Sequence, residues 1–190
     1  MENSYIENKD YQGLDFRVEK LSSGEYELCI FKDCIFSNLD LTGFSFTECE
    51  FENCDLSNAF GKNISMRDVI FRNCKILGFR FDQCNPFLLS FSFEDCILNF
   101  TSFYRLKIKG TKFVNCKLQN ADFTESGLSL SVFNKCDLTG AVFQNSDLTS
   151  VNFENSYNFE IDPEINKLKG AVFSKNSLAG LLTKHQLRIK

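Results

Sequence analysis

Nine cysteines and one histidine are the residues of this chain that could support metal binding or nucleophilic catalysis. Cys29 and Cys34 are separated by four residues, as are Cys49 and Cys54, and this spacing falls within the range of zinc ligand pairs. His185 is far along the chain, and the sequence places no cysteine or serine beside it. A metal site or a reactive thiol would therefore have to be assembled by the fold.

The positions of the cysteines follow a period of five residues. Each lies two residues before the centre of a five-residue unit, in a slot that Ala, Ser or Thr fills in other units. A slot reserved for small residues is typical of a crowded interior, so we predict structural thiols, without zinc or disulfides, in a reducing compartment. The thiols are Cys29, Cys34, Cys49, Cys54, Cys74, Cys84, Cys96, Cys116 and Cys136.

The centre of each unit is a large apolar residue. A period of five fits neither a helix, which repeats its buried face every 3.6 residues, nor a strand, which repeats every two. The first register is Tyr26, Phe31, Phe36, Leu41, Phe46, Phe51, Leu56, Met66, Phe71, Ile76 and Phe81, with Gly61 as its gap. The second is Phe93, Leu98, Phe103, Ile108, Phe113, Leu118, Phe123, Leu128, Phe133, Leu138, Phe143, Leu148 and Phe153.

Four units form one coil, because identical residues recur at every fourth unit. Cys34 and Cys54 show this spacing, and Phe31, Phe51 and Phe71 repeat it. Units too small to bury their own apolar face must stack on neighbours. The pattern predicts an all-β protein, a right-handed quadrilateral parallel β-helix of about seven to eight coils and roughly 35 to 40 Å in length.

The regularity divides the chain into three parts. Residues 1–25 repeat poorly and are expected to form an irregular cap, and residues 26–158 form the β-helix, with a two-residue bulge at 85–90. Residues 159–190 hold the last coil, a short helix and a tail. Leu178, Leu181 and Leu182 lie on one helical face, Ser174 or Ser177 could cap its start, and Gly180 costs it about 1 kcal/mol.

Several units are similar to those of the pentapeptide repeat family. The segments ADFTE, CDLTG, SDLTS and CDLSN each place a small residue, an aspartate, a large apolar residue and two polar residues in that order. The resemblance covers residues 26–178 and implies the right-handed quadrilateral β-helix of that family.

The C-terminal segment, LKGAVFSKNSLAGLLTKHQLRIK, resembles the end of the Qnr-type quinolone-resistance members. The matching residues are Leu168, Gly170, Leu178, Leu181, Leu182 and Ile189. This resemblance implies a homodimer formed by Leu178, Leu181 and Leu182. It also implies a DNA-mimicking rod that binds DNA gyrase or topoisomerase IV and protects it from quinolones. The enterobacterial members have longer loops than the two-residue bulge of this chain.

Outward charges predict where such a partner would bind. The net charge is only −4, but acids gather on two neighbouring faces of the predicted coil. The partner-binding candidates are Asp33, Asp40, Glu50, Glu52, Asp82, Glu94, Asp95, Asp122, Glu125 and Glu154. Residues 101–117 instead contain five bases and no acid, which weakly favours nucleic acid there. Charges that serve only solubility are the alternative for any single position.

Some aromatic residues fall outside the inward slots. Phe60, Phe87, Phe100 and Tyr104 are expected near Gly61 and the bulge. Phe87, Phe100 and Tyr104 are therefore possible apolar anchors for a partner. Alternatively, Phe60 or Phe87 turns inward and fills a gap in the core.

Other classes of function find little support. No apolar run is long enough for a membrane span, and the polar N-terminus does not resemble a secretory signal, so we expect a cytoplasmic protein. Carboxylates on convex faces are poorly placed for catalysis, and no cofactor motif is present. The sequence thus predicts a binding protein, not an enzyme, that makes no direct contact with nucleic acid or membrane. The alternative to topoisomerase protection is a structural or regulatory scaffold with an unassigned partner.

Overall fold

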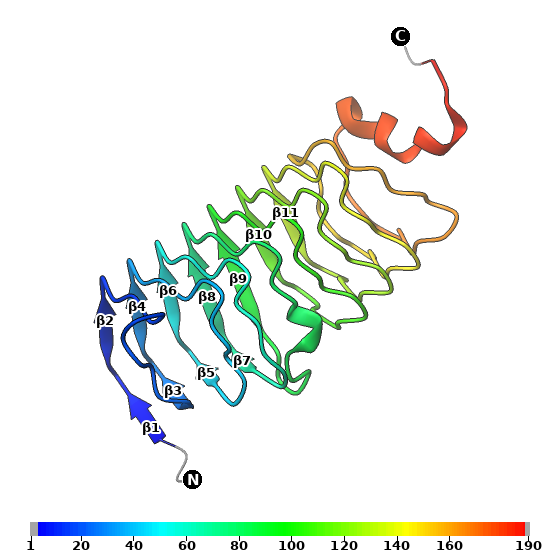
Figure 1. Cartoon of the computed structure of the whole chain (residues 1–190). Helices are drawn as coiled ribbons and strands as arrows, with labels where there is room; N and C mark the ends of the chain where they lie inside the picture. Colours follow the sequence, from blue (N-terminus) through cyan, green and yellow to red (C-terminus); the bar gives the residue numbers. More distant parts are fainter. Residues whose placement is uncertain (1–3, 189–190) are drawn as a thin grey trace.

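The chain forms one rod of stacked coils, seen in a computed structural model that describes residues 4–188 (Figure 1). The N-terminus lies at one end of the rod and the C-terminal helical segment at the other. Short strands form two parallel sheets, one with the order β1-β3-β5-β7 and one with the order β2-β4-β6-β8-β9-β10-β11. We number the four sides by their inward residues: Phe31 is on side 1, Phe36 on side 2, Leu41 on side 3 and Phe46 on side 4.

Strands occur on sides 1 and 4. Side 1 contains β2 (Asp10–Gln12), β4 (Ile30–Lys32), β6 (Glu50–Glu52), β8 (Val69–Arg72), β9 (Phe91–Glu94), β10 (Lys112–Val114) and β11 (Val132–Asn134). Side 4 contains β1 (Ser4–Glu7), β3 (Gly24–Glu27), β5 (Ser45–Thr47) and β7 (Ser65–Arg67). Single parallel bridges connect the coils on the other two sides, for example Ile35 with Asp55 on side 2 and Ser102 with Asp122 on side 3. The four-sided parallel β-helix, with about seven turns, is therefore confirmed.

The register also confirms that four units make one coil. Phe31 pairs with Phe51 and Phe93 pairs with Phe113, so each centre lies beside the centre four units later. The pairing of Phe71 with Phe93 spans a slightly longer coil. The extra residues of that coil belong to the bulge, which follows the 3-10 helix η1 (Phe81–Gln83).

The corners explain why the repeat contains so much Asn and Asp. The second residue after most inward centres has a positive φ, as Asn38, Asn53 and Asn58 do, and Asn tolerates that conformation better than most side chains. The Asp or Asn before a centre has a different role. Its side chain accepts a hydrogen bond from the backbone N–H two residues later, as Asp122 does from Thr124 at 2.9 Å.

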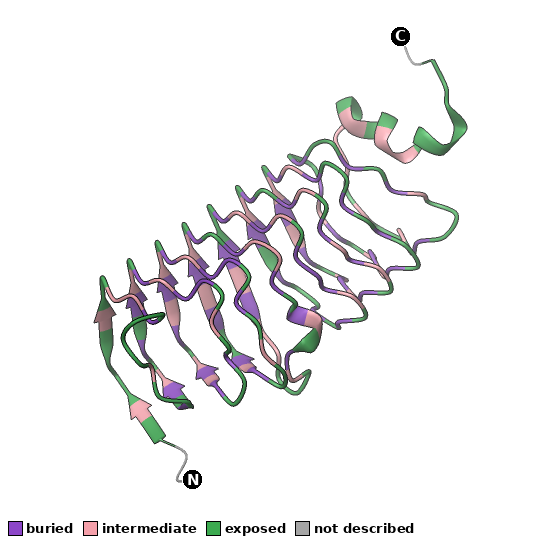
Figure 2. Ribbon diagram, viewed as in Figure 1, coloured by how far each residue is buried: buried purple, intermediate pink, exposed green. Residues whose placement is uncertain are grey.

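Buried residues recur at the same positions of successive coils and form the core (Figure 2). On side 1 the phenyl rings are stacked along the rod, with Phe113 and Phe133 at a centroid distance of 4.6 Å and an interplanar angle of 8°. The nine cysteines are buried and free, as predicted. The thiol of Cys54 donates to the carbonyl of Phe31 in the preceding coil at 3.2 Å. The small slot thus also links neighbouring coils.

The first coil begins earlier than the sequence indicates. Residues 1–25 were expected to form an irregular cap, but β1 pairs with β3 and β2 pairs with β4, both in the register of the later coils. Ile6 and Tyr11 occupy the inward centres of this coil. Lys9 and Leu14 stand where later units have a small residue, and this hides the repeat. Among residues 4–25, the irregular part is the segment after Phe16 and before β3.

The aromatic residues at the bulge do not fill the core. The side chains of Phe60 and Phe87 are 54% and 75% exposed, so the inward alternative is wrong for both. Ile64 occupies the space at Gly61, where a Cβ would lie 2.9 Å from Ile64 Cδ1.

The C-terminal helix is of the 3-10 type. It consists of η2 (Lys175–Leu181), with Ser174 at its N-cap position, and η3 (Thr183–His185). Gly180 is required by close packing, because a Cβ there would lie 2.2 Å from the carbonyl oxygen of Phe159. In the part of the chain that the structure describes, no helix is long and apolar enough to cross a membrane.

Candidate functional site

The ten candidate acids lie on the convex surface of sides 1 and 3 and their adjoining corners. Side 1 contributes Glu50, Glu52, Glu94 and Glu154, with Asp33 and Asp95 at the following corner. Side 3 contributes Asp40, Asp82 and Asp122, with Glu125 at its corner. These residues are exposed or half-buried, except that the side chain of Asp82 is only 6% exposed.

Five of these acids form ion pairs with bases. Glu52 pairs with Lys32 at 3.2 Å, and Glu125 pairs with Arg105 at 2.7 Å, in both cases across adjacent coils. The same offset that defines the coil could have identified both pairs from the sequence. Arg72 contacts both Glu50 and Glu94, and Asp82 pairs with Arg80 at 2.6 Å. The base partly cancels the negative potential of each of these carboxylates.

The other five acids form no ion pair within residues 4–188, although Asp82 and, to a smaller degree, Asp122 raise the pKa of Arg80, and four of the five hold the backbone or a neighbouring coil. Asp40 accepts the N–H of Thr42 at 2.9 Å, and Asp122 makes the equivalent bond. Hydrogen bonds from Thr42 hold the pKa of Asp40 below its ordinary value. Asp33 accepts the side-chain N–H of Asn53 at 3.0 Å, and Asp95 accepts that of Asn115. Sequence reasoning missed these structural roles.

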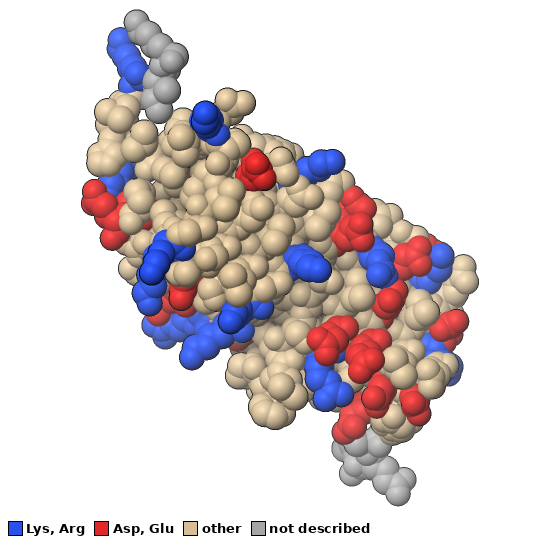
Figure 3. Space-filling view, turned by 180° about the vertical axis from the view of Figure 1, so that it is seen from behind, with Lys and Arg blue, Asp and Glu red and all other residues tan. Residues whose placement is uncertain are grey.

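Charges of the two signs are unevenly distributed along the rod. Figure 3 shows one face on which acidic residues gather toward the N-terminal end and basic residues lie nearer the middle and the C-terminal end. Residues 33–60 contain six acids, whereas the five bases of residues 101–117 lie within a single coil. The acids therefore do not form one continuous surface.

The fold stacks cysteines of successive coils in the interior, as it does Cys54, Cys74 and Cys96, and leaves His185 apart from them in η3. Among the described residues, no group of three His, Cys, Asp or Glu side chains is placed to hold a metal ion. Burial raises the pKa of Cys49 and of Cys84 to about 12, which keeps both as thiols at neutral pH. His185 is exposed in η3.

Comparisons of the sequence with known families agree with the observed coils. Residues 29–60 match the family described as pentapeptide repeats (8 copies), and residues 87–161 match the family described as a pentapeptide repeat region. The chain belongs to the pentapeptide repeat family. A search of curated protein sequences found no significant match.

Solved structures of pentapeptide repeat proteins share the fold. A trypsin-treated variant of QnrB1, a plasmid-mediated fluoroquinolone resistance protein, has a TM-score of 0.64 and 17% identity, with 99% of this chain and 98% of that chain covered. HetL, involved in heterocyst differentiation regulation in the cyanobacterium Nostoc sp. strain PCC 7120, has a TM-score of 0.44 and 12% identity, covering 90% and 88% of the chains. At 17% identity the likeness to QnrB1 shows the fold alone.

The predicted apolar anchors of this pentapeptide repeat protein differ in exposure. Phe87 and Phe100 are 75% and 63% exposed. Tyr104 is half-buried, and the Arg105 guanidinium lies over its ring, 4.8 Å from the centroid. Phe87 and Phe100 are therefore more accessible to a partner than Tyr104 is.

The predicted dimer residues divide into two groups. Leu178 and Leu182 face solvent, whereas Leu181 packs against the core. Lys184 bonds to Asp162 at 2.9 Å and so ties the end of the helical segment to the last coil. Of the residues that resemble the Qnr-type terminus, Leu168 packs against the core, Gly170 forms a corner with φ of 73°, and Ile189 lies outside the described residues.

Proposed function

We propose that this pentapeptide repeat protein is a non-catalytic rod that binds a bacterial type II topoisomerase, DNA gyrase or topoisomerase IV, in the cytoplasm. It would occupy the site of duplex DNA and thereby protect the enzyme from quinolones. The observation that supports this proposal is that the Qnr fold extends over 99% of the chain, with exposed carboxylates on two of its sides.

The five acids that form no ion pair within residues 4–188 are the best candidates to imitate DNA phosphates. Duplex DNA carries one negative charge per about 1.7 Å, so a duplex as long as this rod carries roughly 20 negative charges. The protein carries fewer negative charges than such a duplex. Its mimicry of DNA would therefore depend on where the carboxylates lie more than on the total charge. The residues are Asp33, Asp40, Asp95, Asp122 and Glu154.

The test is a supercoiling assay with gyrase and ciprofloxacin. We expect the protein to restore supercoiling at micromolar concentration. Replacing Asp33, Asp40 and Asp122 together by Asn should weaken this protection. At Asp40 and Asp122, Asn should keep the turn, since Asn152 already accepts the N–H of Glu154 at 2.8 Å.

A matched control removes charge from the other two sides. Asp137 and Asp147 accept the same turn hydrogen bond on sides 2 and 4, and their replacement by Asn should leave protection unchanged. If the wild-type protein neither protects nor inhibits gyrase, the topoisomerase proposal is wrong. The alternative would then be a scaffold with another partner, an assignment favoured by the five ion pairs that neutralise half of the candidate acids.

A further inference from the structure

The hydrogen bonding between successive coils on side 4 is interrupted near the middle of the rod. Its strands end at β7 (Ser65–Arg67), and its bridges resume only between Lys107 and Gly127. The amides of Gly127 and Asp147 donate to carbonyl groups of the preceding coil at 2.8 Å in both cases. Within the described residues, the equivalent amide of Lys107 has no such acceptor. The loop before β9 thus separates two parts of the hydrogen-bonded ladder.

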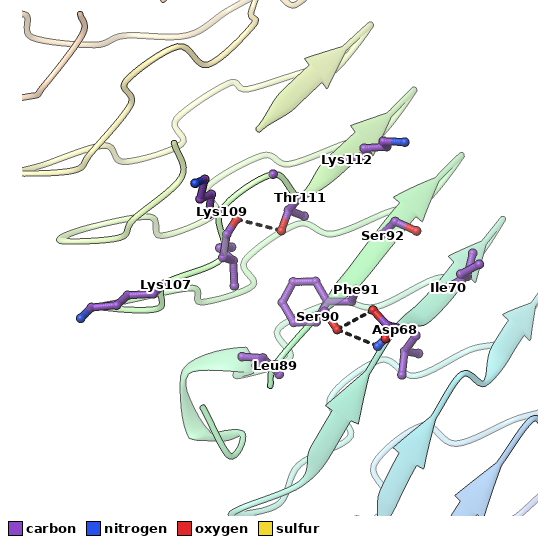
Figure 4. A pocket seen from close by; sticks show the side chains of 13 residues that line it. Asp68, Ile70, Leu89, Ser90, Phe91, Ser92, Lys107, Lys109, Thr111 and Lys112 are labelled. Atoms are coloured by element: carbon purple, nitrogen blue, oxygen red, sulfur yellow. Dashed lines mark hydrogen bonds between the residues drawn. The ribbon is translucent and has the colours of Figure 1, made fainter. Parts of the chain in front are cut away.

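A cavity of about 490 Å³ lies at this interruption (Figure 4). Leu89 and Phe91 contribute its apolar surface, and Phe91 lies in the middle of the view. Ser90 donates to Asp68 at 2.9 Å, which holds that carboxylate against the loop. The cavity is therefore a depression with a mixed polar and apolar lining, in which Phe91 is only 6% exposed.

Three lysines surround this depression. Lys107, Lys109 and Lys112 line the cavity, and all three are exposed. None of them forms an ion pair in the part of the chain that the structure describes, in contrast to Arg105 of the same coil. Figure 4 shows the lysines on different edges of the cavity, so they would contact separate groups of a ligand.

The loop that leads to the cavity exposes apolar side chains. Phe87 is 75% and Leu88 is 54% exposed, directly before Leu89 in the chain. Adjacent large apolar side chains that are exposed are typical of a surface that contacts another protein.

The distance that the unpaired lysines span along the rod axis limits the length of a ligand that can bind them. The unpaired lysines belong to one coil, and coils are about 4.8 Å apart. Residues 33–60 and 118–166, toward the two ends of the rod, contain six and eight acids, which would repel an extended polyanion running along the axis. A short acidic segment of a protein meets this restriction better than a nucleic acid does.

We propose that this cavity binds a short acidic segment of a partner protein, with an apolar side chain between its carboxylates. The apolar side chain would contact Leu89 and Phe91, and the carboxylates would pair with Lys107, Lys109 and Lys112. The site lies where side 4 meets side 1 and contains none of the ten candidate acids, so it does not depend on the topoisomerase proposal.

The experiment measures binding of a labelled synthetic peptide, with glutamates on both sides of a central leucine, to the full-length protein by fluorescence anisotropy. Replacing Lys107 and Lys109 together by Glu should weaken binding roughly tenfold. The matched control replaces Lys167 and Lys169 of the same side by Glu and should change the dissociation constant less than about twofold. Thermal unfolding of each variant checks that the rod is intact.

Three outcomes would overturn the proposal. The first is the absence of peptide binding to the wild-type protein at millimolar concentration. The second is an equal loss of affinity in the Lys167 and Lys169 variant, which would indicate non-specific attraction. The third is tighter binding of oligothymidylate than of the peptide, which would assign the lysines to nucleic acid.

Discussion

Phe31 and Phe51 stack with their ring centroids 4.8 Å apart and their planes inclined by 12°, although they belong to different coils of the chain. This distance is close to the spacing of neighbouring strands, so the stacked rings have the same spacing along the rod as the backbone. The stack extends from Tyr11 to Phe173 and includes the wider coil between Phe71 and Phe93, where the centroid distance is 5.2 Å. The bulge therefore adds residues without breaking the core.

Removal of one ring from this stack should strongly destabilise the rod. Phe113 is fully buried between Phe93 and Phe133. We expect Phe113→Ala to lower the free energy of unfolding by about 3 to 5 kcal/mol, because it leaves a cavity in a rigid column. Urea denaturation measures this change. Phe100→Ala on the surface should cost less than about 0.5 kcal/mol, and equal effects would contradict the stacked core.

The aspartate before each inward centre should stabilise the rod mainly because its side-chain oxygen accepts a hydrogen bond, and less because of its charge. Asp122 accepts the N–H of Thr124, and Asn can make the same bond. Asp122→Ala should therefore lower stability by about 1 kcal/mol, whereas Asp122→Asn should have a much smaller effect. Thermal unfolding of the two variants compares them. A loss as large for Asn as for Ala would show that the charge is the important feature.

The turn aspartates also predict how stability depends on pH. Hydrogen bonds from Thr149 lower the pKa of Asp147 below its ordinary value of 3.8, and those from Thr42 do the same for Asp40. A lowered folded-state pKa means that the stabilisation is complete above the ordinary value and is lost as the pH falls through the folded value. The melting temperature of the wild type should fall in that acidic range. The double variant with Asn at both positions should show a shallower fall, and an identical pH profile would refute this explanation.

The period of five predicted the fold well because the core depends on a few inward slots with strict size requirements. It predicted the column of Phe31 and the buried slot of Cys54. It did not identify the first coil, because Lys9 occupies a slot that needs a small residue only where another coil covers it. The role of Asp122 was missed because an outward carboxylate has the same sequence pattern whether it binds a partner or the backbone.

The exposed leucines of the helical segment should form the contact between two rods if the protein is a dimer. Leu182→Asp places a charge in that contact, and sedimentation should show a monomer in place of the dimer. Leu130→Asp is the control, because Leu130 is also an exposed leucine but lies at a corner far from the end of the rod. A wild-type monomer, or a dimer that survives Leu182→Asp, would argue against this interface.

Competition between the protein and DNA for gyrase tests the proposed function most directly. A labelled duplex bound to gyrase should be displaced by the wild-type rod, as measured by a fall in fluorescence anisotropy. The variant with Asn at Asp33, Asp40 and Asp122 should displace it less, while the Asp137 and Asp147 control should act as the wild type does. If the duplex stays bound at saturating wild-type protein, the rod does not occupy the DNA site and the proposed mimicry is contradicted.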